Sequence, residues 1–565
     1  MKRCPQCNHI ATDDLLAFCR TDGVRLVNDG DSSTDDETAA LVVEAPVART
    51  SVLEESLNQR AATRMIDSAW RTSLVAKLIG TTKRRITVAA VVSILALLLA
   101  GSAYYSSSRT KNDAITSVAV LPFINVNADP QLEYLSDGMT EMLIYDLSRL
   151  PALNVKARAS VFQYKGKDVT PRTIGADLNV QAVLSGRIML HGEVLTLSLE
   201  MADARTENVI WSEQYDSKQA EIVSLQSEVA RDVSDKLRMK LSGADQRRLS
   251  NNYTKNAEAY QLYLKGRFYW NKRTAKDLEK AIDYFNQAAA LDQNYALAYA
   301  GLADSYVLLP FYRDAPIGEG MRQARDAATK ALSLDSNLVE AHVSLGFVNT
   351  CESDFSEAQR EFKLAIELNP NYATAHIWCG VMLSYLGRHR EALLELQRAL
   401  EIDPLSLIAN VRYGEGLFYA RRYDEAIAQL KKAIELDADF ERAHSTLSTV
   451  YQAKGSYAEA VDEYARYQEL MGQQQTATLV RASFAKGGWQ EFLRTMTGGE
   501  KRVNLSRYNS VVFLTALGEK DKAFTELEMS FEVFGRLLKV DPLLDPLRDD
   551  ARFAALLRRV GLPTA

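Results

Sequence analysis

The sequence predicts a multidomain protein: a small cysteine-containing module and one transmembrane helix precede an α/β domain and an all-α solenoid of helical repeats. Three observations lead to this prediction. Three of the five cysteines lie within the first 19 residues, and residues 86–105 carry no charge. Beyond about residue 257, small residues recur every 34 positions. A chain of 565 residues is also too long for one ordinary core.

Residues 1–27 contain two short turns that predict a metal site. Cys4 and Cys7 form a CPxC turn, in which two thiolates can share one tetrahedral ion. The second turn, FCRTDG, supplies Cys19 and then Asp22 where a fourth cysteine is expected. The stretch resembles short bacterial zinc ribbons that end in an FCxxDGxxL pattern. The resemblance implies a structural Zn²⁺ held by Cys4, Cys7, Cys19 and Asp22.

Two alternatives to this ligand set stay open. His9 or a water molecule could replace Asp22 as the fourth ligand, because tetrahedral zinc accepts nitrogen and oxygen donors. The module could also be a metal-free vestige. A catalytic zinc site is not expected, because so small a ribbon cannot build a substrate cleft around an open position. Residues 28–82, which include DGDSSTDDETAA, are predicted to form an acidic, flexible tether and a juxtamembrane segment.

Residues 86–105, ITVAAVVSILALLLAGSAYY, are predicted to span a membrane. Twenty uncharged residues match the roughly 30 Å thickness of a bilayer core. Lys83, Arg84 and Arg85 precede the run, so the positive-inside rule places the N-terminus in the cytoplasm and the later domains outside. The expected location is the cell membrane, with a single pass. The alternatives are a buried core helix and a cleaved signal peptide, which would begin within about the first 30 residues.

Residues 115–242 are predicted to form an α/β domain with the order β-α-β-α-β-β-β-α. SVAVLPF at 117–123 is a short apolar run that ends at proline, as in a buried strand. Residues 131–150 have apolar residues at helical spacing. Two alternating runs flank His191-Gly192, which indicates a β-hairpin with His191 on the surface.

The same region carries the motifs VAVLPF, YLSDGMTE, YKG, LSG and WSEQYD in order. It resembles the TolB amino-terminal-like domain of bacterial envelope and signalling proteins, which implies a binding or assembly module. Asp137, Glu141 and Asp146 raise the possibility of paired-carboxylate catalysis. We expect instead that Asp137 is the N-cap of a helix, since an acidic residue there accepts hydrogen bonds from free backbone amides.

Residues 256–470 show a 34-residue period, which is typical of tetratricopeptide repeats. The residues that keep this step include Ala358, Ala392, Ala426 and Ala460, and also Gly346, Gly380 and Gly414. Small residues at fixed helical positions let paired helices approach closely, and stacking buries the apolar face that one pair cannot bury alone. About six repeats are predicted. Nine extra residues in the second repeat are placed around 310–316, between its two helices.

The first helix of each repeat lines the concave face in this family, which gives the partner-binding prediction. The apolar and aromatic residues at these positions suit an extended or helical partner segment. The alternative is that some of them pack between repeats. The predicted partner-binding residues are Val343, Phe347, Ile377, Val381, Tyr385, Val411, Phe418 and Tyr419.

Residues 471–565 are predicted to contain a degenerate helical pair at 507–533 and a short C-terminal helix that caps the solenoid. The same pattern closes many bacterial proteins that join a TolB-like domain to such repeats. The net charge of −6 and the absence of a long basic tract argue against nucleic acid as the main partner.

The sequence is compatible with two functions and argues against a third. The first is a membrane-anchored scaffold that binds partner polypeptides in the groove of its repeats at the cell envelope. The second is a transmembrane signalling adaptor whose cytoplasmic ribbon contacts a regulatory partner. The third, an enzyme, is not expected, because no combination of nucleophile, base and oxyanion donors is visible. The sequence predicts no oligomeric state.

Overall fold

The computed structural model describes residues 2–3, 10–11, 27–28, 115–130, 132–237, 242–243, 245, 254–313, 316–498 and 505–561. The chain divides into two compact units, Met1–Lys111 and Asn112–Ala565. The predicted zinc ligands, tether and transmembrane segment 86–105 lie outside the described residues. Among the residues that are described, no helix has both the length and the apolar character needed to cross a membrane.

In the first unit the described residues form a small antiparallel sheet. Its strands are β1 (Lys2–Arg3), β2 (Ile10–Ala11) and β3 (Val27–Asn28), in the order β2-β1-β3. Lys2 pairs with Ala11 on one side and with Asn28 on the other. The first strand therefore lies between the two strands that follow it in sequence.

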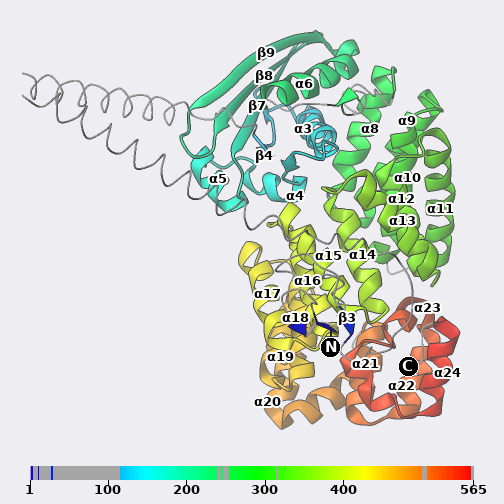
Figure 1. The fold of residues 1–565 in the computed structure, drawn as a ribbon. Helices are drawn as coiled ribbons and strands as arrows, with labels where there is room; N and C mark the ends of the chain where they lie inside the picture. Colours follow the sequence, from blue (N-terminus) through cyan, green and yellow to red (C-terminus); the bar gives the residue numbers. More distant parts are fainter. Residues whose placement is uncertain are drawn as a thin grey trace, which may run out of the picture. The chain divides into compact units, whose positions relative to one another are not determined.

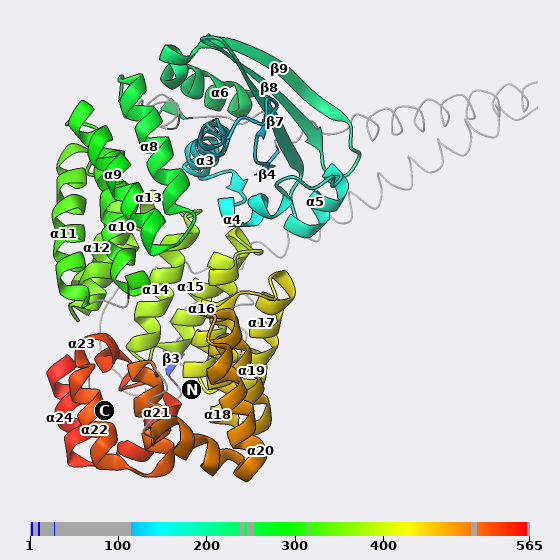
Figure 2. The same cartoon turned by 180° about the vertical axis from the view of Figure 1, so that it is seen from behind.

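The second unit begins with an α/β domain built on one mixed sheet (Figures 1 and 2). The sheet order is β6-β4-β7-β8-β9, and the short β5 also pairs with β7. The first strands run parallel, whereas β7, β8 and β9 form an antiparallel meander. The strands are β4 (Ser117–Val120), β5 (Ile124–Asn125), β6 (Asn154–Val155), β7 (Ala182–His191), β8 (Val194–Asp203) and β9 (Val209–Lys218).

Helices cover one face of this sheet. The main helices are α3 (Glu133–Ser148), α5 (Pro171–Leu178) and α6 (Ile222–Lys236), with a short α4 at Arg158–Val161. Along β8, Leu195, Leu197 and Leu199 are buried, whereas the residues between them face away from this core. This alternation is expected for a strand that is covered on one side. The predicted elements are present in the predicted order, with the short β5 and α4 in addition, and the hairpin at His191-Gly192 is confirmed with His191 exposed.

The prediction that Asp137 caps a helix is wrong. Helix α3 begins one turn earlier, at Glu133 after the N-cap Leu132, so Asp137 lies within the helix and its side chain is buried. The sequence misled because aspartate is a common N-cap residue, whereas here the glycine that follows it serves close packing. A Cβ on Gly138 would lie 2.9 Å from Cβ of Leu264, a residue of the first repeat helix.

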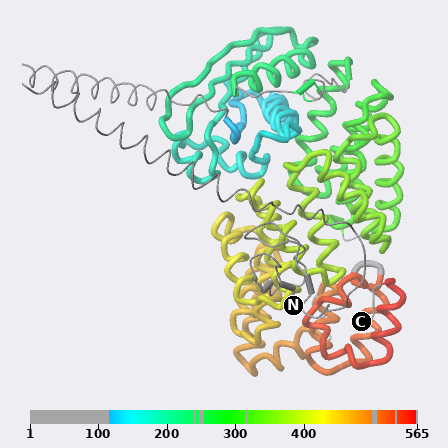
Figure 3. The backbone as a smooth tube through the Cα atoms, in the orientation of Figure 1, coloured from blue at the N-terminus to red at the C-terminus, as the bar shows by residue number. Residues whose placement is uncertain are grey.

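Twelve helices from Ala257 to Leu470 form six antiparallel pairs, which Figure 3 shows as a continuous coil. The sequence prediction of a helical-repeat solenoid is confirmed. The helices are α8 (Ala257–Trp270), α9 (Ala275–Leu291), α10 (Ala296–Arg313), α11 (Ile317–Leu334), α12 (Val339–Cys351), α13 (Phe355–Leu368), α14 (Ala373–Tyr385), α15 (His389–Ile402), α16 (Leu407–Tyr419), α17 (Tyr423–Leu436), α18 (Glu441–Lys454) and α19 (Tyr457–Leu470).

The recurring glycines mark the closest approach within each pair. A Cβ on Gly346 of α12 would lie 2.6 Å from the ring of Phe362 on α13, so no side chain fits there. The sequence predicted that the extra residues of the second repeat lie between its two helices. This prediction is wrong in part. Helix α10 instead continues through Pro310 to Arg313 and is therefore longer than the first helices of the later repeats.

The chain then returns through a C-terminal cap whose core around Phe492, Phe513 and Phe553 is continuous with Tyr464 of α19. The predicted degenerate pair is present as α21 and α22, and the predicted final helix as α24. The elements of the cap are α20 (Gln474–Thr497), α21 (Arg507–Leu517), α22 (Lys520–Met529), α23 (Phe531–Phe534), η3 (Gly535–Leu537), η4 (Pro542–Leu547) and α24 (Ala551–Val560).

Candidate functional site

The predicted partner-binding residues lie on α12, α14 and α16, as the 34-residue period requires. Most of them are buried: Val343, Phe347, Ile377, Val381, Val411 and Phe418 are each 8% exposed or less. Only Tyr385 and Tyr419, at the C-terminal ends of α14 and α16, are half-buried. The expected apolar surface is therefore largely closed in this conformation, and contact of these residues with a partner stays a prediction.

Two aromatic residues that the sequence did not single out extend this row. Phe347 makes an edge-to-face contact with Trp378, with ring centroids 4.4 Å apart, and a second one with Phe311 at 5.9 Å. The guanidinium of Arg412 lies 5.2 Å from the Trp378 ring. Phe311 is 45% exposed, so it is open to a partner. Phe311 lies in the lengthened end of α10, and Trp378 is the residue next to Ile377. Neither occupies a groove position of the 34-residue period, so the sequence did not predict them.

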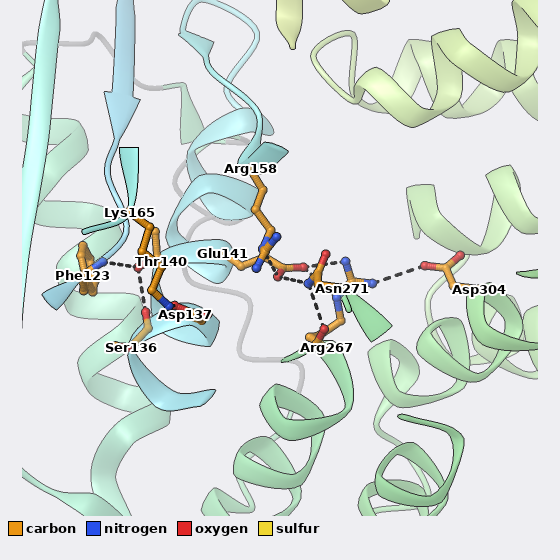
Figure 4. A network of polar contacts seen from close by, with 10 residues as sticks. All are labelled: Phe123, Ser136, Asp137, Thr140, Glu141, Arg158, Lys165, Arg267, Asn271 and Asp304. Atoms are coloured by element: carbon orange, nitrogen blue, oxygen red, sulfur yellow. Dashed lines mark hydrogen bonds and ion pairs between the residues drawn. The ribbon is translucent and has the colours of Figure 1, made fainter. Parts of the chain in front are cut away.

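At the start of the array, the α/β domain docks through buried charges, which Figure 4 shows. Glu141 on α3 accepts hydrogen bonds from Arg267 Nε and from Asn271 Nδ2, each at 2.8 Å. Arg158 Nε lies 3.0 Å from the same carboxylate. Burial acts to raise the pKa of Glu141, but the positive charges of Arg267 and Arg158 outweigh it and hold the pKa below its ordinary value.

The network continues into the second repeat. Arg267 on α8 also reaches Asp304 on α10 at 3.4 Å, and Asp304 accepts a hydrogen bond from Ser344 of α12 at 2.7 Å. These groups follow one another along successive first helices of the repeats. A carboxylate of the α/β domain is therefore the first member of a polar chain that runs into the solenoid.

The other two carboxylates considered for catalysis have separate structural partners. Asp137 pairs with Lys165 at 2.5 Å, and the same ammonium group contacts Glu133. Asp146 accepts a hydrogen bond from Gln226 of α6 at 3.3 Å, and burial raises its pKa to about 7. The three carboxylates are thus engaged with three different sets of partners rather than with one another. Within the described residues, no cluster of three or more His, Cys, Asp or Glu side chains is placed to hold a metal ion.

A second contact joins the α/β domain to the turns between repeats. Ser160 donates a 2.5 Å hydrogen bond to Asp403 and Lys156 donates to the carbonyl oxygen of Glu401 at 2.7 Å. Asn371 Nδ2 donates to the carbonyl oxygen of Leu153 at 2.9 Å. Asn371 and Asp403 belong to the ELNPNY and EIDPLS turns. The turns that close two repeats therefore also contact the α/β domain.

The C-terminal cap contacts the opposite ends of the same first helices. Arg536 Nη1 donates to the carbonyl oxygen of Cys351, the last residue of α12, at 2.9 Å. Arg421, just after α16, makes two hydrogen bonds with Asp545, at 2.7 and 2.9 Å. The array is therefore held by other parts of its own chain at both ends of α12, α14 and α16.

Comparison with protein families supports the repeats. The models of the TPR repeat and of the tetratricopeptide repeat match residues 414–455 and 352–406. The chain therefore contains tetratricopeptide repeats, joined to an N-terminal sheet-containing domain. Residues 114–232 match the model of the HilA/YgeH-like transcriptional regulator, second domain. The resemblance of this region to the TolB amino-terminal-like domain stays a prediction.

Among curated proteins, the chain is similar to a putative adenylate cyclase 3 of Rhizobium meliloti, with 31% identity over 246 residues. That match covers 43% of this chain and 42% of the relative. It is also similar to the transcriptional regulator HilA of Salmonella typhimurium, with 22% identity over 254 residues, 44% of each chain. The chain thus spans less than half the length of these curated relatives.

Among solved structures, the array is similar to YrrB, described as a TPR protein with an unusual peptide-binding site. The identity is 22% and the TM-score 0.25, over 35% of this chain and 97% of YrrB. It is also similar to a thermophilic TPR protein of Thermus thermophilus, with 17% identity and a TM-score of 0.30, over 34% of this chain and 99% of that one.

Proposed function

We propose that this chain is a membrane-anchored scaffold whose tetratricopeptide array binds partner polypeptides at the cell envelope. The observation that carries the proposal is the array of six helix pairs between Ala257 and Leu470, within which two repeat models match. Stacked pairs of this kind create a long concave surface, and binding an extended or helical segment is the ordinary use of such a surface.

The row formed by Phe311, Phe347 and Trp378 supports a peptide as the ligand. Aromatic side chains supply large contact areas at small cost in conformational entropy, and binding energy concentrates at them. Arg412 beside Trp378 is already paired with Glu415 at 2.6 Å, so this row offers a partner aromatic rather than charged contacts. We therefore place the first contact with the partner at Phe311, the exposed end of this row.

The anchor is proposed from residues 86–105, whose uncharged run follows Lys83, Arg84 and Arg85. In this arrangement residues 1–82 face the cytoplasm and the array lies outside. Protease added to spheroplasts is expected to digest the array and to spare the first 82 residues, together with the segment that spans the membrane. Digestion of residues 1–82 in intact spheroplasts would contradict the proposed topology.

We further propose a structural Zn²⁺ on Cys4, Cys7, Cys19 and Asp22, and no catalytic activity for the chain. The metal would fix the two turns of the ribbon and leave no position open for a substrate. Metal analysis of the purified chain tests this part. One zinc per chain, lost in Cys7→Ser, is expected, and zinc that is unaffected by this substitution would contradict the ligand set.

A transmembrane signalling adaptor is the second candidate. One observation favours it: over the region shared with this chain, the similar proteins are a putative adenylate cyclase and a transcriptional regulator. In the adaptor, the α/β domain and the array would receive a partner outside the membrane. The ribbon would then pass the signal to a regulatory protein in the cytoplasm.

Crosslinking in cells separates the two candidates. A photoreactive residue at Phe311 reports on the groove, one at Asn8 reports on the ribbon, and one at Leu394 is the control because that side chain is 60% exposed on a second helix. Adducts from Phe311 alone support the scaffold, whereas adducts from both Phe311 and Asn8 support the adaptor. If neither site forms adducts and the purified chain turns over a substrate, both proposals fail.

A further inference from the structure

The turn between the two helices of a repeat contains a residue in the left-handed region of the backbone. Four of these residues follow the 34-residue period. The turn of the first repeat is equivalent, because Arg273 follows Gly266 at the same spacing as Ser353 follows Gly346, and both glycines face a phenylalanine of the second helix. Glycine adopts this conformation freely, whereas other residues are strained in it. The turn residues, with φ from 55° to 85°, are Arg273, Ser353, Gly387, Arg421 and Gly455.

Arg421, the turn residue of the fifth repeat, shows what an arginine does at this position. Its guanidinium forms two hydrogen bonds with the carboxylate of Asp545 in the cap, at 2.7 and 2.9 Å. A guanidinium matches a carboxylate in this two-bonded geometry. The hydrogen bond with Asp545 raises the pKa of Arg421 above its ordinary value. The turn therefore presents an arginine to an acidic side chain that comes from another part of the structure.

Arg273, the turn residue of the first repeat, has the same backbone conformation but no such partner. Among the residues that the structure describes, no carboxylate forms a hydrogen bond or an ion pair with its side chain. Burial lowers the pKa of Arg273 to about 10, and the charges of Arg267 and Arg158 act in the same direction. Asp304 opposes this effect, but it is already engaged with Arg267. Arg273 is thus a half-buried cation that no described carboxylate neutralises.

The indole ring of Trp270 orients this cation. Arg273 Cζ lies 3.6 Å from the ring centroid, and Arg267 Cζ lies 4.2 Å from the same centroid. At this separation the flat face of the Arg273 guanidinium meets the ring, which leaves the N–H donors at its edge for an acceptor. Glu141 and Asp304 take the donors of Arg267, as Figure 4 shows.

The site lies at the beginning of the groove. Arg267 and Phe347 occupy the same position in their repeats, since each follows the glycine that faces the phenylalanine of the second helix. Tyr312, whose hydroxyl group influences the pKa of Arg273, is the neighbour of Phe311, and both aromatic residues are 45% exposed. A partner segment that contacts Phe311 is therefore within reach of Arg273.

We propose that Arg273 binds an aspartate or glutamate side chain of the partner polypeptide, in the way that Arg421 binds Asp545. This inference rests on the proposed function and gives the partner segment a chemical character: an acidic residue close to the residue that contacts Phe311. A carboxylate fits better than an amide or a hydroxyl group, because it neutralises the cation and accepts two parallel hydrogen bonds.

Immobilised peptides test this inference with the purified full-length chain in detergent. All peptides are acetylated and C-terminally amidated and share the same phenylalanine and leucine residues, while their other positions hold either glutamate or glutamine. We expect about tenfold more chain on the glutamate peptides, because hydrogen bonds to charged groups contribute more than neutral ones. Arg273→Gly should reduce this ratio to about one.

Arg273→Gly also separates binding from folding. Glycine takes the left-handed turn without strain, as Gly387 and Gly455 do, and loss of an uncompensated cation offsets the lost contact with Trp270. The urea midpoint should therefore not decrease. If the ratio falls only together with the urea midpoint, Arg273 serves the fold and the proposal is overturned.

Lys272→Ala is the matched control, because it removes one exposed positive charge at the neighbouring position. The ammonium group of Lys272 lies over Phe268 and Tyr269, at 4.4 and 4.9 Å from the ring centroids. The glutamate preference should persist in this variant. An equal loss in Lys272→Ala would assign the preference to general attraction by a basic surface and would overturn the site.

The remaining outcomes separate the acidic site from the proposed function. Selective retention on glutamine peptides with a free C-terminal carboxylate, in place of the glutamate peptides, would assign Arg273 to a chain end and overturn the proposal. If all peptides bind alike and Phe311→Ser weakens every one, the scaffold stands and the acidic site fails. If no peptide is retained and no adduct forms from Phe311 in cells, the scaffold and the site both fail.

Discussion

His342 Nδ1 lies 2.5 Å from Glu361 Oε2, and its Nε2 lies 3.0 Å from the carbonyl oxygen of Ser336. Both ring nitrogens thus face oxygen acceptors, and a neutral imidazole has only one N–H to donate. The pair must therefore hold an additional proton, either on the ring or on the carboxyl group. Glu361 also contacts Arg360, at 2.6 Å. This buried pair links the two helices of the third repeat, α12 and α13.

The same arrangement recurs with the 34-residue period. His376 contacts Glu395 and the carbonyl oxygen of Pro370, and His444 contacts Glu463 and the carbonyl oxygen of Ala438. In the repeat between them, neutral groups take the same places. Asn410 donates to the carbonyl oxygen of Pro404 at 3.1 Å and accepts from Gln429 at 2.5 Å. The pair Asn410–Gln429 is therefore an uncharged equivalent of the His–Glu pairs within the same chain.

The first prediction concerns pH. Burial acts to lower the pKa of His342, but its hydrogen bonds with Glu361 and Ser336 outweigh this and raise the pKa above its ordinary value; His444 behaves alike with Glu463. Because the folded pKa lies above the unfolded value of about 6.5, the stabilisation is complete below that pH. It is lost as the pH rises through the folded pKa. The urea midpoint of the purified chain should therefore decrease as the pH is raised from 6 to 9.

Replacing a His–Glu pair by Asn–Gln, and the Asn–Gln pair by His–Glu, tests whether these pairs cause the pH dependence. His342→Asn with Glu361→Gln should flatten the pH dependence, because the pair then resembles Asn410–Gln429. Asn410→His with Gln429→Glu should steepen it. Equal pH dependence of the urea midpoint in all three chains would show that other groups set the response.

The second prediction concerns Glu340, which lies on α12 and receives a 3.4 Å hydrogen bond from Tyr145 of the α/β domain. Burial raises the pKa of Glu340 to about 7. Its folded pKa thus exceeds the unfolded value, and stability is lost as the pH rises from about 4.5 through 7. Glu340→Gln should raise the free energy of unfolding at pH 8 by roughly 1–3 kcal/mol. The exposed Glu435→Gln is the matched control, and an equal gain there would refute the assignment.

Much of the architecture could be predicted from the sequence, because it follows from local periodicity. The 34-residue step of Gly346, Gly380 and Gly414 reports a contact within each repeat, and that contact is repeated wherever the step holds. The alternation along β8 likewise reports a sheet that is covered on one face. Such signals need no knowledge of distant parts of the chain.

The contact between the cap and the groove could not be predicted in this way. The guanidinium of Arg536 lies 6.0 Å from the ring centroid of Tyr385, although the two residues are 151 positions apart in sequence and no periodic pattern links them. The role of Glu141 was missed for the same reason, because its partner Arg267 belongs to another domain. A carboxylate on a helix looks the same in sequence whether it caps, catalyses or joins two domains.

The third prediction tests that junction. Glu141→Gln leaves Arg158 and Arg267 buried without their shared anion, and breaking such a pair costs about 3–5 kcal/mol. The loss should appear as a lower urea midpoint and as separate unfolding of the α/β domain and the array. Glu133→Gln is the control, because Glu133 is half-buried and Lys165 keeps Asp137 as its partner. Equal losses in both variants would count against a special role of the junction.

The fourth prediction concerns the packing of α3 on the first repeat. A methyl group on Gly138 would lie 2.9 Å from Leu264 Cβ and 3.0 Å from its Cδ2, which is closer than carbon atoms approach without displacement. Overpacking of this kind costs about 1–3 kcal/mol, more than the roughly 1 kcal/mol that alanine gains over glycine within a helix. Gly138→Ala should therefore lower the urea midpoint. Gly318→Ala on α11 is the matched control, because a Cβ there meets nothing within 4 Å and the change should be neutral or stabilising. If Gly138→Ala stabilises the chain as much as Gly318→Ala does, the two helices are not held at this distance in solution.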